Sequence, residues 1–104
     1  MRDAKLTAPE TIELFDEPMI REPEAGEARV RVKAVGICGT DLHIFKGERS
    51  DVALPRVMGH ELSGIVESVG SGVTHIKEGD HVVFDPVVSC GTCKVCRSGH
   101  ANVC

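Results

Sequence analysis

The sequence has very few aromatic residues and no long apolar run. Its 104 residues include three Phe and neither Tyr nor Trp, so Val, Ile, Leu and Ala must form the core. A chain of this length has a modest core. No stretch approaches the roughly 20 apolar residues that span a membrane, and residues 1–10 lack the apolar segment of a signal peptide. We therefore expect a cytoplasmic protein with no membrane partner.

Positive charge is also too sparse for a nucleic-acid-binding surface. Twelve Lys and Arg residues against sixteen Asp and Glu residues give a formal net charge of -4, and the basic residues form no stripe. Proteins that bind DNA or RNA concentrate positive charge where they contact the phosphates. The composition therefore argues against nucleic acid as a partner.

Short alternating segments separated by Gly and Pro predict a mainly β fold. Thr40 to Phe45 can form one helical turn, capped by Thr40 or Asp41 and ended by Gly47. The absence of strand–helix alternation favours a small barrel or sandwich. The predicted strands cover residues 11–15, 29–35, 61–69 and 81–84, and residues 29–35 alternate as a half-buried strand does.

Four of the five cysteines lie at the C-terminal end, with spacings typical of a metal site. They are Cys90, Cys93, Cys96 and Cys104, in a lobe with little apolar periodicity. In a reducing compartment such a cluster favours metal over disulfides or free thiols, and four thiolates complete the tetrahedral shell of a structural zinc ion. An iron–sulfur cluster is the other alternative. The bacterial ferredoxin motif, however, places its fourth cysteine after three residues, not seven.

A second group of candidate ligands comprises Cys38, His60 and Glu61. One sulfur, one imidazole and one carboxylate form an incomplete shell, which leaves a position for water or substrate as in a catalytic zinc site. Each residue also has an ordinary interpretation when taken alone. Cys38 could be a small buried apolar residue, Asp41 a helix cap and His43 a solvated side chain.

The order of these motifs resembles that of the zinc-containing medium-chain alcohol and polyol dehydrogenases, in particular the sorbitol and threonine dehydrogenase branch. The resemblance runs from about Val30 to Cys104. His81 stands where the family usually has Arg, a minor departure. The matching segments are Gly36 to His43, Gly59-His60-Glu61 followed by Gly64, Gly70 and Val73, the turn from Lys77 to Val82, and the four-cysteine lobe.

The resemblance implies a GroES-like, partly open β-barrel with short helical turns and a zinc-bound cysteine lobe. It implies one catalytic zinc ion on Cys38, His60 and Glu61, and one structural zinc ion on the four cysteines. Asp41 would orient His60. Thr40 would hydrogen-bond the alcohol and pass its proton to His43. The implied reaction is NAD(P)-linked, zinc-assisted oxidation of an alcohol, with a secondary, polyol-like or threonine-like substrate.

The resemblance also implies that residues 1–104 are the N-terminal, zinc-binding portion of a catalytic domain. Because the chain stops on a candidate ligand, Cys104, we expect it to be part of a longer protein. In this family NAD(P) binds a separate Rossmann domain. Gly70-Ser71-Gly72 has no third glycine and no following helix, so it predicts a turn and not a nucleotide site. We expect these residues alone to be inactive, and the full-length enzyme to be a homodimer or homotetramer.

Three other functions fit parts of the pattern. A stand-alone structural zinc module for protein interaction would need the cysteine lobe but no second, open site. A GroES-like chaperonin subunit would need neither metal site, and an electron-transfer protein would hold iron and sulfide. Metal content and colour discriminate among them, because the dehydrogenase requires two zinc ions and has no chromophore.

Overall fold

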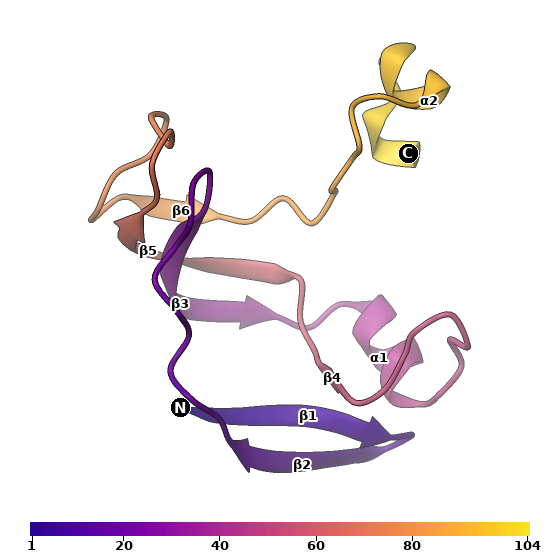
Figure 1. The fold of residues 1–104 in the computed structure, drawn as a ribbon. Helices are drawn as coiled ribbons and strands as arrows, with labels where there is room; N and C mark the ends of the chain where they lie inside the picture. The colour runs from indigo at the N-terminus through magenta and orange to yellow at the C-terminus, as the bar shows by residue number, and fades with distance from the viewer.

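The computed structural model describes residues 1–104 as a mainly β protein with three short helices (Figure 1). The helices are α1 (Gly39–Phe45), α2 (Lys94–Arg97) and the 3-10 helix η1 (Ala101–Val103). The strands are β1 (Arg2–Ala8), β2 (Thr11–Asp16), β3 (Ala28–Gly36), β4 (Arg56–Val57), β5 (Glu61–Val69) and β6 (His81–Val83).

The strands form two antiparallel sheets of three strands each. One sheet has the order β2-β1-β4 and the other β3-β5-β6. The pairing of β3 with β5 runs from Ala28 opposite Val69 to Gly36 opposite Glu61. Neither sheet closes on itself, so the predicted mainly β, partly open barrel is confirmed.

The four predicted strands are present, with ends that differ by one residue at most. Strands β1 and β4 were not predicted. In β1 only Leu6 is buried, while Ala4 and Ala8 are small and exposed, so the strand has no clear apolar alternation. Strand β4 has only two residues and exists because it pairs with Lys5 and Leu6 of β1. Long-range pairing therefore forms β4, whereas β1 is one arm of the local β1–β2 hairpin.

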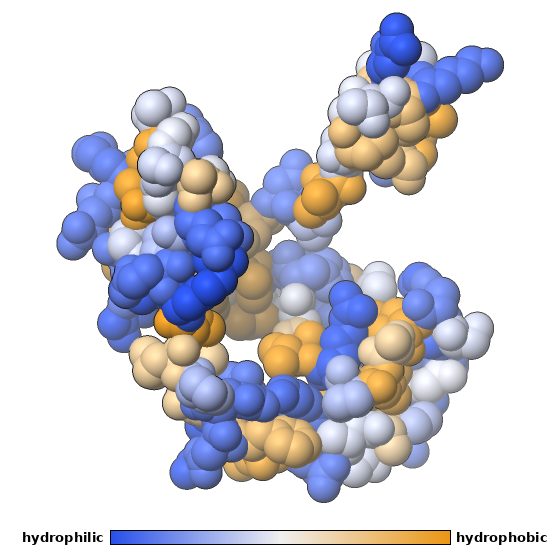
Figure 2. Space-filling view, viewed as in Figure 1, coloured by the Kyte–Doolittle hydropathy of each residue, from blue (hydrophilic) through white to orange (hydrophobic).

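The core is smaller than the hydrophobic pattern suggests. Leu6 and Val66 are the only large side chains that are fully buried. The half-buried alternation expected for β3 is wrong, because residues 28–30 are all partly buried and residues 31–36 are all exposed, with Val32 and Val35 at 45% and 53%. The radius of gyration is 16.0 Å, against about 13 Å for a compact chain of this length. Figure 2 shows the resulting open shape, with apolar residues beside the central hollow.

The C-terminal lobe stands away from both sheets at the end of an extended segment (Figure 1). It contains α2 and η1, and neither helix has a buried residue. Apolar packing therefore does not hold this lobe in shape. Its four cysteine side chains face one another instead, as the composition of this segment predicts.

Candidate metal centres

The four cysteines of the C-terminal lobe converge on one point. The Sγ atoms lie 3.6 Å apart for Cys90 and Cys104, 3.9 Å for Cys90 and Cys96, and 4.0 Å for Cys93 and Cys104. All four sulfurs lie within 4.8 Å of one another, and none forms a disulfide. Four sulfurs at about 2.3 Å from a tetrahedral zinc ion would lie about 3.8 Å from each other. The donor set therefore fits zinc in both chemistry and spacing.

Backbone N–H groups donate hydrogen bonds to these sulfurs. The N–H of Cys93 lies 3.3 Å from Sγ of Cys90, the N–H of Cys96 lies 3.4 Å from Sγ of Cys93, and the N–H of Cys90 lies 3.4 Å from Sγ of Cys104. The two-residue gaps produce this geometry, because Cys93 is the N-cap of α2 and its sulfur accepts from the first turn. These donors stabilise negative charge on the sulfurs.

The pKa values of the lobe's thiols move in opposite directions. The backbone N–H groups of Thr92 and Cys93, followed by the Thr92 hydroxyl and Cys104, lower the pKa of Cys90 to about 5. The backbone N–H of Cys96 lowers the pKa of Cys93. The neighbouring thiol of Cys93 and burial raise the pKa of Cys96. Crowded thiols oppose full ionisation of the group, and a divalent cation among them removes that opposition.

The second cluster forms where the end of β3 and the start of α1 meet the segment before β5. Cys38 is the N-cap of α1, and its Sγ accepts the N–H of Thr40 at 3.2 Å. Asp41 completes a capping box by accepting the N–H of Cys38 at 3.0 Å. The expected caps, Thr40 and Asp41, were therefore wrong. A sulfur takes the place of the usual cap oxygen, which sequence rules for helix starts do not include.

His60 reaches this cluster from the other segment. Its Nε2 lies 3.2 Å from Sγ of Cys38, and its Nδ1 lies 3.3 Å from Oδ1 of Asp41. A sulfur and an imidazole nitrogen that share a tetrahedral zinc ion would lie about 3.5 Å apart. Asp41 is buried and holds the opposite ring nitrogen, so Nε2 faces the sulfur. These residues fit an open zinc site with at least two protein ligands.

The pKa values of this pair shift in the directions that favour ionised forms. Hydrogen bonds from the Thr40 hydroxyl and backbone lower the pKa of Cys38, with smaller contributions from Asp41 and His60. The Cys38 sulfur, followed by the charge of Asp41, raises the pKa of His60.

The remaining candidate residues lie around the cluster. Glu61 is not part of the group of Cys38, Asp41 and His60, because its carboxylate lies over Gly36 on the neighbouring strand. A Cβ atom on Gly36 would be 2.6 Å from Oε2 of Glu61. Thr40 is exposed beside Cys38. His43, one turn further along α1, points to solvent and contacts Glu48.

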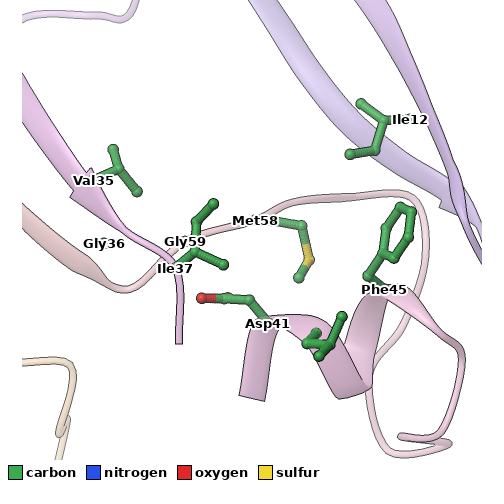
Figure 3. A pocket seen from close by; sticks show the side chains of 9 residues that line it. Ile12, Val35, Gly36, Ile37, Asp41, Phe45, Met58 and Gly59 are labelled. Atoms are coloured by element: carbon green, nitrogen blue, oxygen red, sulfur yellow. The ribbon is translucent and has the colours of Figure 1, made fainter. Parts of the chain in front are cut away.

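Two hollows flank the cluster. An apolar pocket of about 300 Å³ lies between the β1–β2 hairpin and α1, with Asp41 at its edge (Figure 3). Ile12, Ile37, Phe45 and Met58 line this pocket. His60 and Glu61 line a separate, open groove of about 630 Å³ that also borders on Phe84. His60 and Glu61 are thus accessible from the groove, as a site that binds an exchangeable molecule requires.

Sequence reasoning missed two contributors to these sites. One is the Thr92 hydroxyl, which donates to Sγ of Cys90 at 3.6 Å. The other is Glu48, the partner of His43. Hydroxyls next to cysteines and acids five residues after a histidine are common in any sequence, so neither spacing stands out before the fold is known.

Known proteins resemble this chain over most of its length. The sequence pattern of the alcohol dehydrogenase GroES-like domain matches residues 24–104. The starvation-sensing protein RspB of Escherichia coli is 51% identical over 82% of this chain and 25% of its own. The S-(hydroxymethyl)glutathione dehydrogenase of Aspergillus oryzae is 45% identical over 82% of this chain and 22% of its own. The chain therefore spans about a quarter of the length of these curated relatives.

A solved structure agrees with the sequence matches. The rspB alcohol dehydrogenase of Escherichia coli, crystallised with its cofactor NADH, superimposes with a TM-score of 0.87 at 43% identity. The match covers 100% of this chain and 30% of that one. The expected GroES-like fold is confirmed. No helix of the chain has the length and hydropathy needed to cross a bilayer.

Proposed function

Because this chain belongs to the alcohol dehydrogenase GroES-like domain family, we propose that it is the zinc-binding N-terminal part of an NAD(P)-linked alcohol dehydrogenase. The observation that carries the proposal is the 3.2 Å approach of Cys38 and His60, with Asp41 behind the imidazole. A stand-alone structural zinc module has no need for this second, open cluster. Residues 1–104 form the GroES-like portion of the catalytic domain, and NAD(P) binds a Rossmann domain outside them.

The zinc ions have different roles. The structural ion binds to the four cysteines of the C-terminal lobe. It stabilises the lobe, which has no apolar core of its own. Its ligands are Cys90, Cys93, Cys96 and Cys104. Cys38 and His60 hold the catalytic ion, and Glu61 is a further or alternating ligand that must swing from its position over Gly36. When bound, zinc in an open site supplies Lewis-acid polarisation of a substrate oxygen.

The chain's own residues position the alcohol and remove its proton. Thr40 lies beside Cys38 at the exposed start of α1, where its hydroxyl can accept a hydrogen bond from the substrate. His43 follows on the same helix, and its exposed imidazole passes the proton to solvent. Asp41 keeps Nε2 of His60 directed at the metal position by accepting from Nδ1.

The substrate is a small alcohol, and the matching motifs favour a secondary alcohol beside another polar group, as in polyols or threonine. The protein acts in the cytoplasm as a homodimer or homotetramer, and nucleic acid and membranes are not its partners. The net charge of -4 and the lack of a basic stripe support the absence of nucleic acid.

The test uses the full-length protein and the alcohol-dependent reduction of NAD(P)⁺. We expect His60→Ala to reduce turnover to background while NAD(H) affinity is unchanged, because the imidazole is a metal ligand and not a nucleotide contact. The matched control is His75→Ala, which removes an exposed imidazole in the turn after β5, outside both clusters. Turnover that survives in His60→Ala would refute the proposed zinc chemistry. A panel of polyols, threonine and primary alcohols identifies the substrate class.

A further inference from the structure

We propose that Glu48 is a positioning residue for His43, holding its imidazole in the tautomer that proton transfer requires. Oε2 of Glu48 and Nδ1 of His43 are in direct hydrogen-bond contact. This inference rests on the proposed dehydrogenase function, in which His43 passes the substrate proton to solvent. It adds a residue that lies outside both metal clusters.

The end of helix α1 brings Glu48 beside His43. The N–H of Glu48 donates to the carbonyl oxygen of His43 at 3.0 Å. The N–H of Gly47 donates to the carbonyl oxygen of Ile44, also at 3.0 Å. Together these two bonds form a Schellman motif, in which the second residue after the cap folds back over the last turn. The backbone of Glu48 is thus bonded directly to the backbone of the residue whose side chain it contacts.

The β1–β2 hairpin fixes this helix end in place. Gly47 has a φ of +76°, and a Cβ atom there would meet Cγ of Pro9 at 2.7 Å. At the hairpin tip, the N–H of Glu10 donates to the carbonyl of Phe45 at 2.7 Å. The turn that carries Glu48 therefore packs against the β1–β2 hairpin. This packing holds the backbone of Glu48 in place beside His43.

The chemistry of the contact suits a proton relay. A carboxylate that accepts from Nδ1–H leaves Nε2 as the acceptor nitrogen of a neutral imidazole. Nε2 then takes the proton that comes from the alcohol, the carboxylate stabilises the resulting imidazolium, and water accepts the proton that leaves. The hydrogen bond from His43, followed by the charges of His43 and Lys46, lowers the pKa of Glu48, so the carboxylate remains ionised. The side chains are 62% and 51% exposed, which gives the proton an exit.

The first measurement reads the tautomer directly in the zinc-loaded, full-length protein. Proteins labelled with ¹⁵N in the histidine rings report which nitrogen carries the proton. We expect the Nδ1–H form for His43 in the parent protein and a mixture of tautomers in Glu48→Ala. Glu48→Gln has nearly the same size and still offers an oxygen to Nδ1–H, so it should retain much of the parent tautomer. It also serves as the informative variant if Glu48→Ala folds poorly.

The second measurement is alcohol oxidation by the same variants. We expect Glu48→Ala to lower kcat and kcat/KM together by about ten-fold, part of the 10²–10⁴ that a general acid–base group contributes. Glu48→Gln should fall between the parent and Glu48→Ala, because it keeps the hydrogen bond and loses the charge. The control is Asp51→Ala, which removes a carboxylate of the same loop that pairs only with Arg49. We expect this control to leave both readouts unchanged.

The outcomes separate this proposal from the proposed function. If His43→Ala slows alcohol oxidation but Glu48→Ala changes neither tautomer nor turnover, the role of Glu48 is wrong and the dehydrogenase assignment stands. If Asp51→Ala changes the tautomer and the turnover as much as Glu48→Ala does, the effect comes from the negative charge of the loop and not from positioning of His43. The proposal then also fails. If His60→Ala retains full turnover, the error lies in the proposed function itself.

Discussion

Asp41 joins the two candidate ligands of the open site, because its Oδ1 lies 3.3 Å from Nδ1 of His60 while its Oδ2 accepts the N–H of Cys38 at 3.0 Å. Asp41 is also the only charged residue that is buried. One carboxylate thus completes the capping box around the N-cap Cys38 and orients the imidazole of His60. The start of the helix and the metal site therefore depend on the same side chain.

Substituting Asp41→Asn should weaken zinc binding at the open site by about 10–100-fold, the usual effect of removing a carboxylate behind a histidine ligand. The amide keeps the size of the side chain and loses the charge that supports the imidazole. Competition with a chromophoric chelator measures the affinity. Asp51→Asn is the control, since it changes an exposed carboxylate of a nearby loop. If the two variants bound zinc with equal affinity, Asp41 would have no role in supporting the histidine ligand.

Substituting Cys93→Ser should lower the zinc content from two ions to one per chain and lower the Tm by several degrees. Serine can still cap α2, but it is a poor zinc ligand, and the lobe has no buried residue to hold it otherwise. Elemental analysis and thermal unfolding measure both effects. Cys38→Ser makes the same chemical change at the open site and should cost activity with little change in Tm. An unchanged Tm in Cys93→Ser would contradict a structural role for the lobe's zinc.

Substituting Gly70→Ala should lower the free energy of unfolding by about 3 kcal/mol, the upper part of the range for an overpacked site. A Cβ atom at this position would lie 1.7 Å from the carbonyl oxygen of Glu24, so the backbone must move. Gly72→Ala has open space around it and a φ of +82°, so it should cost only the strain of that conformation, about 1–2 kcal/mol. Denaturant titration compares the two variants.

The same pair of variants tests the interpretation of residues 70–72 as a turn. NAD(H) affinity of the full-length protein should be equal in Gly70→Ala, Gly72→Ala and the parent, because these glycines serve chain geometry. A folded Gly72→Ala protein with weakened NAD(H) binding would show instead that this segment contacts the cofactor.

Substituting Leu6→Ala should cost about 2–5 kcal/mol, because the side chain is completely buried and its removal leaves a cavity. Leu14→Ala is the matched control on the neighbouring strand. Its side chain is 66% exposed, so the change should stay within about 0.5 kcal/mol. Chemical denaturation monitored by circular dichroism measures both. Similar losses in the two variants would mean that another part of the full-length protein covers Leu14.

Much of the candidate site could be predicted because metal ligands are chemically rare and their spacing is local. The two-residue gaps among Cys90, Cys93 and Cys96 bring three sulfurs together within one turn, whatever the rest of the chain does. The alternating segments likewise predicted β3, β5 and β6 to within one residue, since strand periodicity depends on neighbours in the sequence.

The sequence by itself therefore determined the mainly β class, the four-cysteine cluster, the candidates Cys38 and His60, and the turn at residues 70–72. Only the tertiary structure decided which atoms meet across long separations. The pairing of β3 with β5 brings His60 beside Cys38 and places Glu61 over Gly36, outside the cluster. Folding of the β1–β2 hairpin onto the end of α1 fixes the turn that brings Glu48 to His43. Local patterns cannot encode such contacts, because they depend on strand register and on elements that pack from distant parts of the chain.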